Sequence, residues 1–277
     1  MAEFRQLGFQ RLPPVVKNII IINVIMVLIQ FVLGRMGIDL AVYLGLHYWK
    51  SPSFHWWQLV TYIFMHGSYN DIGGTFTHIF FNMFALFFFG PPLENMWGPK
   101  RFFIFYMICG IGAALCQLTV LGIEFHSLEN AVNAYAEHPT LSNLLSFAHK
   151  HGLDVTKDAI ERWSSDPNCS DCINSSINNI NDYYNEVVNS ATVGASGAIM
   201  GVLFAFGYLF PNVLIYVWLL VPVKAKWAVA GFAVIELFAG VQNSAGDNVA
   251  HFAHLGGMLF AFILLRIWRI RVGNRYY

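Results

Sequence analysis

Six apolar stretches, each close to the length needed to cross a lipid bilayer, constrain this chain of 277 residues more than any other feature. An α-helix crosses the roughly 30 Å hydrocarbon core of a membrane in about 20 residues. Only 12% of the residues are charged, whereas a soluble domain carries about 25%. We therefore expect an all-α, multi-pass membrane protein. Its expected spans are 18–33, 76–89, 102–123, 195–210, 227–241 and 249–268.

A seventh apolar segment, 213–221, differs from these six because it is short and is bracketed by Pro211 and Pro222. Proline interrupts a helix because it lacks a backbone N–H and clashes with the preceding turn. We therefore predict an interfacial or re-entrant connection here, with a seventh span as the alternative.

Basic residues cluster beside alternate ends of the six expected spans. Short cytoplasmic loops are enriched in Lys and Arg. The clusters are Arg5, Arg11 and Lys17; Lys100 and Arg101; Lys224 and Lys226; and Arg266, Arg269, Arg271 and Arg275. With six spans all four clusters lie on one side, which predicts that both termini are cytoplasmic. Because no small-residue cleavage site follows the first stretch, we expect that stretch to be an uncleaved anchor.

The net charge and the N-terminal sequence limit which partners the protein can bind and which membrane it is expected to occupy. The formal net charge is +0, which argues against nucleic acid as a partner because phosphate binding needs a basic surplus. The N-terminus lacks the Arg-rich pattern of an organelle transit peptide. We therefore expect an integral protein of a bacterial inner membrane, in contact with membrane lipid.

The connection 122–192 breaks the pattern because it is long, polar and rich in Asn, Ser and acidic residues. The span count places it outside the cytoplasm, between the third and fourth spans. We expect spans one to three in 1–121, this extracytoplasmic insertion, and spans four to six in 193–277. Helical patterns at "TLSNLLSFAHKHG" and "DAIERWSS" favour a small helical cap within it.

Two of the four cysteines, Cys169 and Cys172, lie in this insertion as "CSDC". In an oxidising compartment the pair favours a local disulfide. A zinc site would need more ligands than this pair. Cys109 and Cys116 lie in the third span, where we expect them to be apolar filler.

Ser196 opens the fourth expected span in "VGASGAIMG", with Gly194 before it and Gly197 after it. A polar residue inside a membrane span is costly and is a functional candidate for that reason. Gly197 and Gly201 form a small-xxx-small pair, which lets a neighbouring helix approach closely. Taken alone, the serine fits such a packing interface better than it fits a catalytic role.

His254 lies near the outer end of the sixth expected span, and Gly257 and Ala261 follow it at i+3 and i+7. These small residues would complement the Gly197/Gly201 stripe. Two helices pressed together in this way would bring Ser196 within hydrogen-bond reach of His254. An imidazole is the common base that activates a serine nucleophile.

His78 and Asn82 lie four residues apart in the second expected span, so they share one helical face. Acyl transfer needs donors aimed at the oxyanion of the tetrahedral intermediate. An imidazole N–H, an amide N–H and the backbone N–H of Ser196 would supply them, although structural hydrogen bonding is the alternative. His251 is nearer the surface than His254, and we expect it to be a solvated loop residue, with a supporting partner of the site as the alternative.

Taken together, these motifs resemble the rhomboid family of intramembrane serine proteases. The matching segments are "HIFFN" (78–82), "GPPLENMWG" (90–98), "GASGAIMG" (194–201) and "AHLGG" (253–257). The second segment carries the family's glycine, glutamate and glycine at Gly90, Glu94 and Gly98. The resemblance covers nearly the whole chain except the insertion.

The resemblance implies a six-transmembrane-helix rhomboid-like bundle and a serine endopeptidase that cleaves transmembrane protein substrates near the outer membrane surface. Ser196 is then the nucleophile, and His254 is the general base and later the general acid. His78 and Asn82 are the implied oxyanion donors. No cofactor and no metal ion is implied.

Two loops are expected to affect how such a protein contacts lipid headgroups and admits a substrate helix. The chain has Trp57 and Gln58 where the family often has Trp-Arg, so we expect the anchoring of this loop to lipid headgroups to differ. A substrate helix would enter past the fifth span and the loop 242–248, whose glycine and polar residues suit a lid.

Other classes of protein agree less well with the sequence than a rhomboid-like protease does. A non-catalytic rhomboid-like protein that binds client transmembrane helices is the main alternative, although such proteins lack the serine or the histidine. A transporter is disfavoured because Glu236 is the only acid inside a span. An intramembrane metalloprotease needs "HExxH", and "HFAH" at 251–254 lacks the glutamate and the spacing. A soluble hydrolase needs "GxSxG", and Ala198 replaces its second glycine.

Overall fold

The computed structural model describes residues 12–217, 220–242 and 249–270, most of which are helical. The helices are α1 (Pro14–Arg35), α2 (Leu40–Leu44), α3 (Gln58–Thr61), α4 (Ile72–Trp97), α5 (Pro99–Glu137), α6 (Leu141–His151), α7 (Lys157–Ser165), α8 (Ser170–Val188), α9 (Ser196–Leu209), α10 (Ala225–Gln242) and α11 (His251–Ile267). A 3₁₀ turn, η1 (Tyr62–Phe64), follows α3, and two strands, β1 (Leu214–Val217) and β2 (Val221–Lys224), precede α10.

Four of these helices, α1, α4, α5 and α10, are long and apolar enough to cross a membrane. Their outward faces expose large apolar side chains such as Leu28, Phe76 and Phe238, which suits a surface covered by lipid. The remaining apolar helices, α9 and α11, have only 14 and 17 residues. At 1.5 Å per residue they are about 21 and 26 Å long, which is shorter than the hydrocarbon core.

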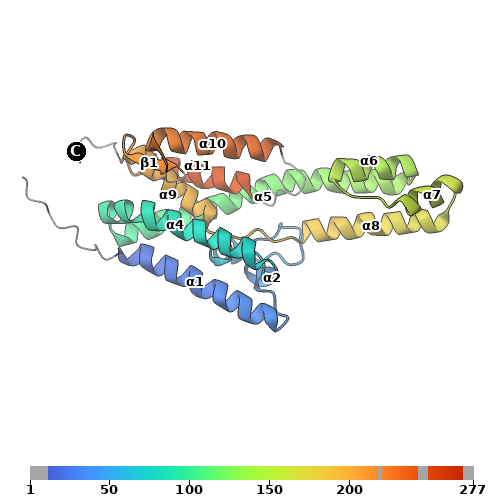
Figure 1. Ribbon diagram of the computed structural model, residues 1–277, viewed down its shortest axis with the longest axis horizontal. Helices are drawn as coiled ribbons and strands as arrows, with labels where there is room; N and C mark the ends of the chain where they lie inside the picture. The colour runs from blue at the N-terminus through green and yellow to red at the C-terminus, as the bar shows by residue number, and fades with distance from the viewer. Residues whose placement is uncertain (1–11, 218–219, 243–248, 271–277) are drawn as a thin grey trace, which may run out of the picture.

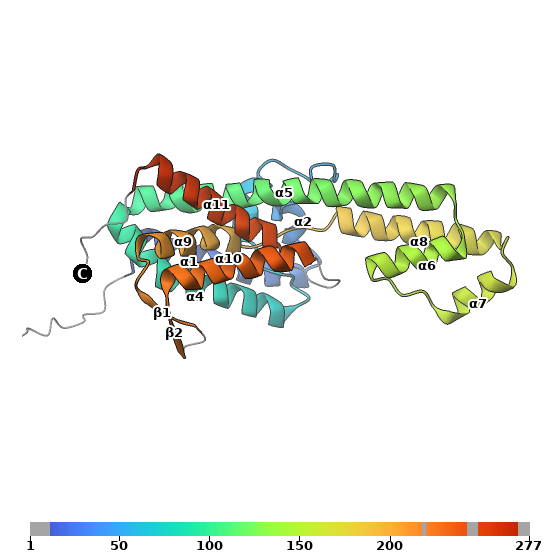
Figure 2. The same cartoon turned by 90° about the horizontal axis from the view of Figure 1, so that it is seen from above.

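The centre of the bundle is formed by α5, α9 and α11, which pack against one another more closely than any other helices. The helices α1, α4 and α10 surround these three (Figures 1 and 2). Large aromatic side chains fill the core beside them, including Tyr62, Phe102, Phe105 and Tyr106, all of which are buried. The helices α5, α9 and α11 are therefore the more enclosed ones, and α1, α4 and α10 face outward.

The helix α5 is much longer than the predicted third span, which ended at residue 123. It continues without a break through the expected domain boundary at 121/122 and ends at Glu137. Its 39 residues are about 58 Å long at 1.5 Å per residue, roughly twice the thickness of the hydrocarbon core. The second half of α5 therefore projects beyond the bundle and joins α6, α7 and α8 (Figure 2).

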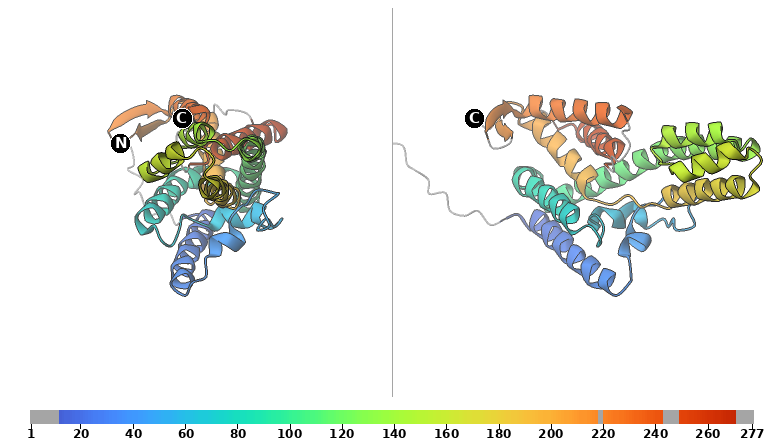
Figure 3. Two further views of the ribbon diagram at one scale, coloured as in Figure 1. Left: turned by 90° about the vertical axis from the view of Figure 1, so that its right-hand side faces the viewer. Right: turned by 45° about the vertical axis from the view of Figure 1, so that its right-hand side comes forward.

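The projecting end of α5 packs with α6, α7 and α8 into an outer helical unit (Figure 3). Its small core contains Leu128, Val132, Tyr135, Phe147 and Ile180. The helices α6 and α7 are N-capped by Thr140 and Thr156, whose hydroxyls accept the backbone N–H three residues later. The expected helices in this region are thus confirmed.

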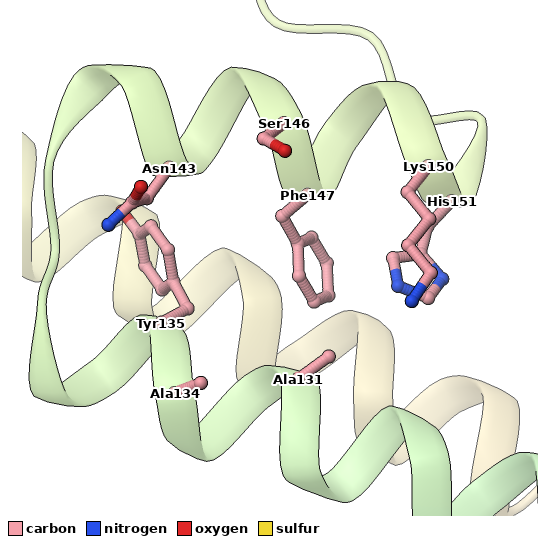
Figure 4. A pocket seen from close by; sticks show the side chains of 8 residues that line it. All are labelled: Ala131, Ala134, Tyr135, Asn143, Ser146, Phe147, Lys150 and His151. Carbon is pink, nitrogen blue, oxygen red and sulfur yellow. The ribbon is translucent and has the colours of Figure 1, made fainter.

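The cysteines of the outer unit form the expected local disulfide, Cys169–Cys172, at the start of α8. A shallow hollow between α5 and α6 is lined by residues such as Tyr135, Phe147 and His151 (Figure 4). Burial lowers the pKa of the His151 imidazole below its ordinary value, so this ring is neutral at pH 7.

The apolar segment 213–221 does not form a seventh helical span, so that alternative was wrong. Its described residues contribute to two antiparallel strands, in which Leu214 pairs with Lys224 and Val217 pairs with Val221. Pro222 lies in β2, opposite Tyr216. The segment is a connection between α9 and α10, as the two flanking prolines predicted.

Glu94 fastens the N-terminus of α1 to α4. Its carboxylate is buried and accepts the backbone N–H groups of Val15 and Val16 at 2.9 and 2.8 Å. The first N–H groups of a helix have no partner within the helix, and the positive end of its dipole favours a carboxylate. One turn earlier in α4, a Cβ on Gly90 would lie 2.7 Å from the Val16 side chain, so the glycine allows α1 to pack closely here.

Gly98 follows the last residue of α4 and has a φ of +79°, a backbone conformation that favours glycine.

Replacing Glu94 tests this connection. Glu94→Ala leaves the two first-turn N–H groups without their acceptor, so we expect the protein to lose about 1–3 kcal/mol of stability. Glu94→Gln keeps one acceptor oxygen and should lose less. Thermal unfolding in detergent measures both variants, with the exposed Glu161→Ala as the control. A Glu94→Ala protein as stable as the control would contradict the proposed role of this carboxylate.

Candidate active site

Ser196 is the first residue of α9, and its side chain faces His254 on α11. Nε2 of His254 and Oγ of Ser196 lie 2.8 Å apart. When Nε2 is unprotonated, the serine hydroxyl donates a hydrogen bond to it. The histidine is buried and the serine is partly exposed at the helix end. This is the geometry in which an imidazole can remove the proton of a serine nucleophile.

Glycines allow α9 and α11 to approach closely enough for this contact. A Cβ on Gly257 would overlap the carbonyl oxygen of Gly197, and a Cβ on Gly201 would lie 3.0 Å from the carbonyl oxygen of Gly257. Gly201 also faces Cys109, and Ala261 is fully buried. The two small-residue stripes that the sequence indicated therefore face each other. Side chains at these positions would hold the helices apart.

Gly194 positions the backbone just before Ser196. Its φ of +130° is a conformation that residues with a side chain rarely adopt, and its N–H donates to the carbonyl oxygen of Tyr62 at 3.0 Å. A Cβ at Gly194 would lie 2.8 Å from the ring of His78. The structure thus places the His78 imidazole beside the backbone that leads into Ser196.

Asn82 lies one turn further along α4 than His78 and is buried. Its side-chain amide donates a hydrogen bond to the carbonyl oxygen of His78 at 2.9 Å. Among the described residues, the Asn82 side chain makes this one hydrogen bond, to its own helix. The structure therefore brings Ser196, His254 and His78 together, but it does not bond Asn82 to any of the other three side chains. An amide has two N–H groups, and only one is used here.

Glu236 and His251 complete the surroundings of His254. Oε2 of Glu236, on α10, lies 2.9 Å from Nδ1 of His254 and 2.7 Å from Nδ1 of His251. The expectation that His251 is a solvated loop residue was wrong, because it begins α11 and its side chain is only 14% exposed. Glu236 was noted only as an acid inside a span and was not among the predicted site residues. An acid inside an apolar span needs a partner, and that signal pointed to it.

A second group of buried polar residues supports His78 from the side of α1. Nε2 of His66 lies 2.7 Å from Oδ1 of Asn23, and the rings of His66 and His78 meet edge to face at 5.2 Å. Gln30 donates a hydrogen bond to the carbonyl oxygen of Gly67 at 2.8 Å. Two polar side chains of α1 therefore hold the segment on which the His78 ring rests.

The loop that carries Trp57 and Gln58 is held by hydrogen bonds of the buried Gln58 side chain. Gln58 is fully buried, and its side-chain oxygen accepts the backbone N–H groups of His47 and His55, both at 3.2 Å. Its amide donates to the carbonyl oxygen of Ser53 at 2.8 Å. Gln58 therefore does not reach lipid headgroups, whereas Trp56 is largely exposed. The loop expected to act as a lid, 242–248, lies outside the described residues except for Gln242.

Comparison with known proteins identifies the family. A model of the rhomboid domain matches residues 53–124 and 172–270, which together make up more than half of the chain. The chain belongs to the rhomboid family and, with its apolar helices, is an integral membrane protein. The matched residues omit 125–171, where the end of α5 and the helices α6 and α7 lie.

Two curated relatives are similar over most of the chain. "Putative rhomboid protease YdcA" from Bacillus subtilis is 26% identical over 211 residues, which cover 76% of this chain and 65% of the relative. "Rhomboid protein 1, mitochondrial" from Saccharomyces cerevisiae is 26% identical over 250 residues, which cover 84% of this chain and 52% of the relative. The chain thus spans less than two thirds of the length of each.

The glycine contact between α9 and α11 yields a direct test. Gly257→Ala adds a Cβ where the Gly197 carbonyl oxygen lies, so the helices must separate. We expect a loss of about 1–3 kcal/mol of stability and at least tenfold slower labelling of Ser196 by a fluorophosphonate, about 1.4 kcal/mol in barrier. Gly231→Ala on α10 is the matched control, because its Cβ would meet open space. Equal labelling of the two variants would refute the argument.

Proposed function

We propose that this chain is an intramembrane serine protease that hydrolyses peptide bonds of transmembrane protein substrates by a dyad of Ser196 and His254. The observation that carries the proposal is the 2.8 Å contact between Oγ of Ser196 and Nε2 of His254 in a helical membrane protein. Membership of the rhomboid family supports the same class of reaction, and one relative is named a rhomboid protease.

In the proposed reaction Oγ of Ser196 attacks the scissile carbonyl carbon while Nε2 of His254 takes the hydroxyl proton. The imidazolium then gives this proton to the leaving amine, and water releases the acyl group by the same route in reverse. The Glu236 carboxylate, 2.9 Å from Nδ1 of His254, stabilises the imidazolium electrostatically while the charge is present.

The oxyanion of the tetrahedral intermediate requires donors beside Ser196. The His78 ring is adjacent to the backbone at Gly194, and the backbone N–H of Ser196 is at the unpaired N-terminal end of α9. These two groups are the proposed first donors. Asn82 would contribute the N–H that is not bonded to the His78 carbonyl oxygen.

For the arrangement in the membrane, we propose six spans formed by α1, α4, α5, α9, α10 and α11. The start of α1, the turn between α4 and α5, the strands β1 and β2 and the end of α11 gather at one end of the bundle (Figure 1). Lys17, Lys100, Arg101, Lys224 and Arg266 belong to these segments. We assign this end and both termini to the cytoplasm of a bacterial cell.

The opposite end contains the starts of α9 and α11 and, beyond them, the outer helical unit (Figure 1). Ser196 and His254 would then lie near the outer membrane surface, where water can reach them. The proposed division keeps 122–192 as an extracytoplasmic insertion between membrane parts 1–121 and 193–277. Its first segment is the projecting end of α5, which belongs to the same continuous helix as the third span.

Removing the serine hydroxyl is the first test of activity. Ser196→Ala should leave a folded protein that neither cleaves a model transmembrane substrate in liposomes nor reacts with a fluorophosphonate. Wild type should do both, as should the control Ser164→Ala, which changes an exposed serine of α7. Cleavage by Ser196→Ala would refute the dyad. A wild-type protein that neither cleaves nor reacts would favour a rhomboid-like protein that binds client helices without cutting them.

Asn82→Ala tests the third oxyanion donor. Removing one such donor slows acyl transfer by roughly 10- to 1000-fold, and we expect kcat to fall within this range with KM nearly unchanged. Steady-state cleavage in liposomes measures the two constants separately. An unchanged kcat would leave Asn82 with only its hydrogen bond to the carbonyl oxygen of His78.

A further inference from the structure

Three potential metal ligands converge beside the dyad, on the side of His254 that faces away from Ser196. They are Glu236, His251 and His254, each of which offers one ligand atom within 4.8 Å of the other two, and Oε2 of Glu236 lies next to Nδ1 of both histidines. The two histidines come from the first turn of α11, and the glutamate comes from α10. Two imidazoles and one carboxylate are a common zinc ligand set in proteins.

One atom of this group lacks a good hydrogen bond. Nδ1 of His254 is buried and has no hydrogen-bond partner of good geometry among the described residues, although Oε2 of Glu236 lies only 2.9 Å away. The oxygen is therefore close to Nδ1 but off the direction of a ring N–H. Buried polar atoms of this kind are uncommon and call for an explanation. An ion placed between the three atoms would satisfy Nδ1.

We propose that Glu236, His251 and His254 form a regulatory site that binds Zn²⁺ or a similar divalent transition metal and thereby inhibits the dyad. In a tetrahedral site with bonds of about 2.0–2.2 Å, neighbouring ligand atoms lie about 3.4 Å apart. The present contacts of 2.7 and 2.9 Å would lengthen by about 0.7 and 0.5 Å. Side-chain rotation supplies such a shift, and water would take the fourth position.

The site is enclosed yet accessible. The side chains of Glu236 and His254 are each 10% exposed and that of His251 is 14% exposed, at the end of the bundle where α11 begins. Nitrogen ligands favour zinc and copper over magnesium and calcium, which prefer sites made of oxygen atoms. The search for "HExxH" missed this group because its carboxylate lies on a neighbouring helix.

Metal binding at Nδ1 of His254 would inhibit the dyad because it changes which of the two ring nitrogens carries the proton. In the active state Nδ1 of His254 carries the proton and Nε2 accepts the Ser196 hydroxyl. A metal bound to Nδ1 displaces this proton, and the neutral ring then carries its proton on Nε2. The number of protons on the ring stays the same, but Nε2 becomes a donor. Ser196 then has no base to take its proton.

The binding part of the proposal does not depend on the proposed activity, whereas the inhibition part rests on it. Binding is therefore measured first, on purified Ser196→Ala protein without an affinity tag, by calorimetric titration with zinc chloride in detergent. We expect one zinc ion per chain and no measurable heat with magnesium chloride. Adding His251→Asn should weaken zinc binding at least tenfold, whereas His126→Asn, at an exposed histidine of α5, should not weaken it.

Inhibition is measured on proteins that retain Ser196. Zinc should inhibit both substrate cleavage and fluorophosphonate labelling by wild type, and EDTA should restore both. His251→Asn keeps an amide that can donate to Glu236; with each variant's inhibition expressed relative to its own cleavage rate without zinc, we expect at least tenfold less sensitivity to zinc. His126→Asn should remain as sensitive as wild type.

Three results would overturn the proposal, and each differs from a failure of the proposed function. Absence of zinc binding by Ser196→Ala protein would refute the site. Zinc binding that is unaffected by His251→Asn would place the ion elsewhere. Binding at the site without inhibition of an active wild type would refute the effect on the His254 ring. A wild type that shows no activity at all leaves the calorimetric result to decide whether the site exists.

Discussion

The close contact between α9 and α11 is the constraint on which the rest of the site depends. Gly257 rests against the carbonyl oxygen of Gly197, and only this separation brings Oγ of Ser196 to 2.8 Å from Nε2 of His254. Hydrophobic attraction contributes little between helices that lipid already solvates, so small residues and close packing must hold them together. The same glycines therefore contribute to stability and to the proposed chemistry.

Several polar groups inside the bundle have hydrogen-bond partners outside their own helix. Glu94 accepts two N–H groups of α1, Gln58 organises its loop, and Asn23 meets His66. The Glu94 and Asn23 contacts join segments far apart in the chain, because lipid offers no hydrogen bonds to a polar group left alone. These contacts, rather than the apolar surfaces, fix which helix lies beside which.

Local patterns explain what the sequence could predict. Apolar length indicated where the membrane helices lie, and the spacing of Gly197, Gly201, Gly257 and Ala261 indicated which faces meet. The continuation of α5 was missed because the sequence becomes polar there, which indicated a connection, whereas the helix runs on through Gly122, which packs against the ring of Trp49. Glu236 was not predicted as a site residue for a different reason, since its partners lie on another helix and no spacing along the chain reveals them.

The unbroken helix α5 also has a mechanical consequence. Ala113, near its middle, packs against Gly197 and Gly256, and its far end belongs to the outer helical unit. Because α5 is continuous from the bundle into the outer helical unit, a load that tilts the outer helical unit would be transmitted along α5 to the contact between α9 and α11.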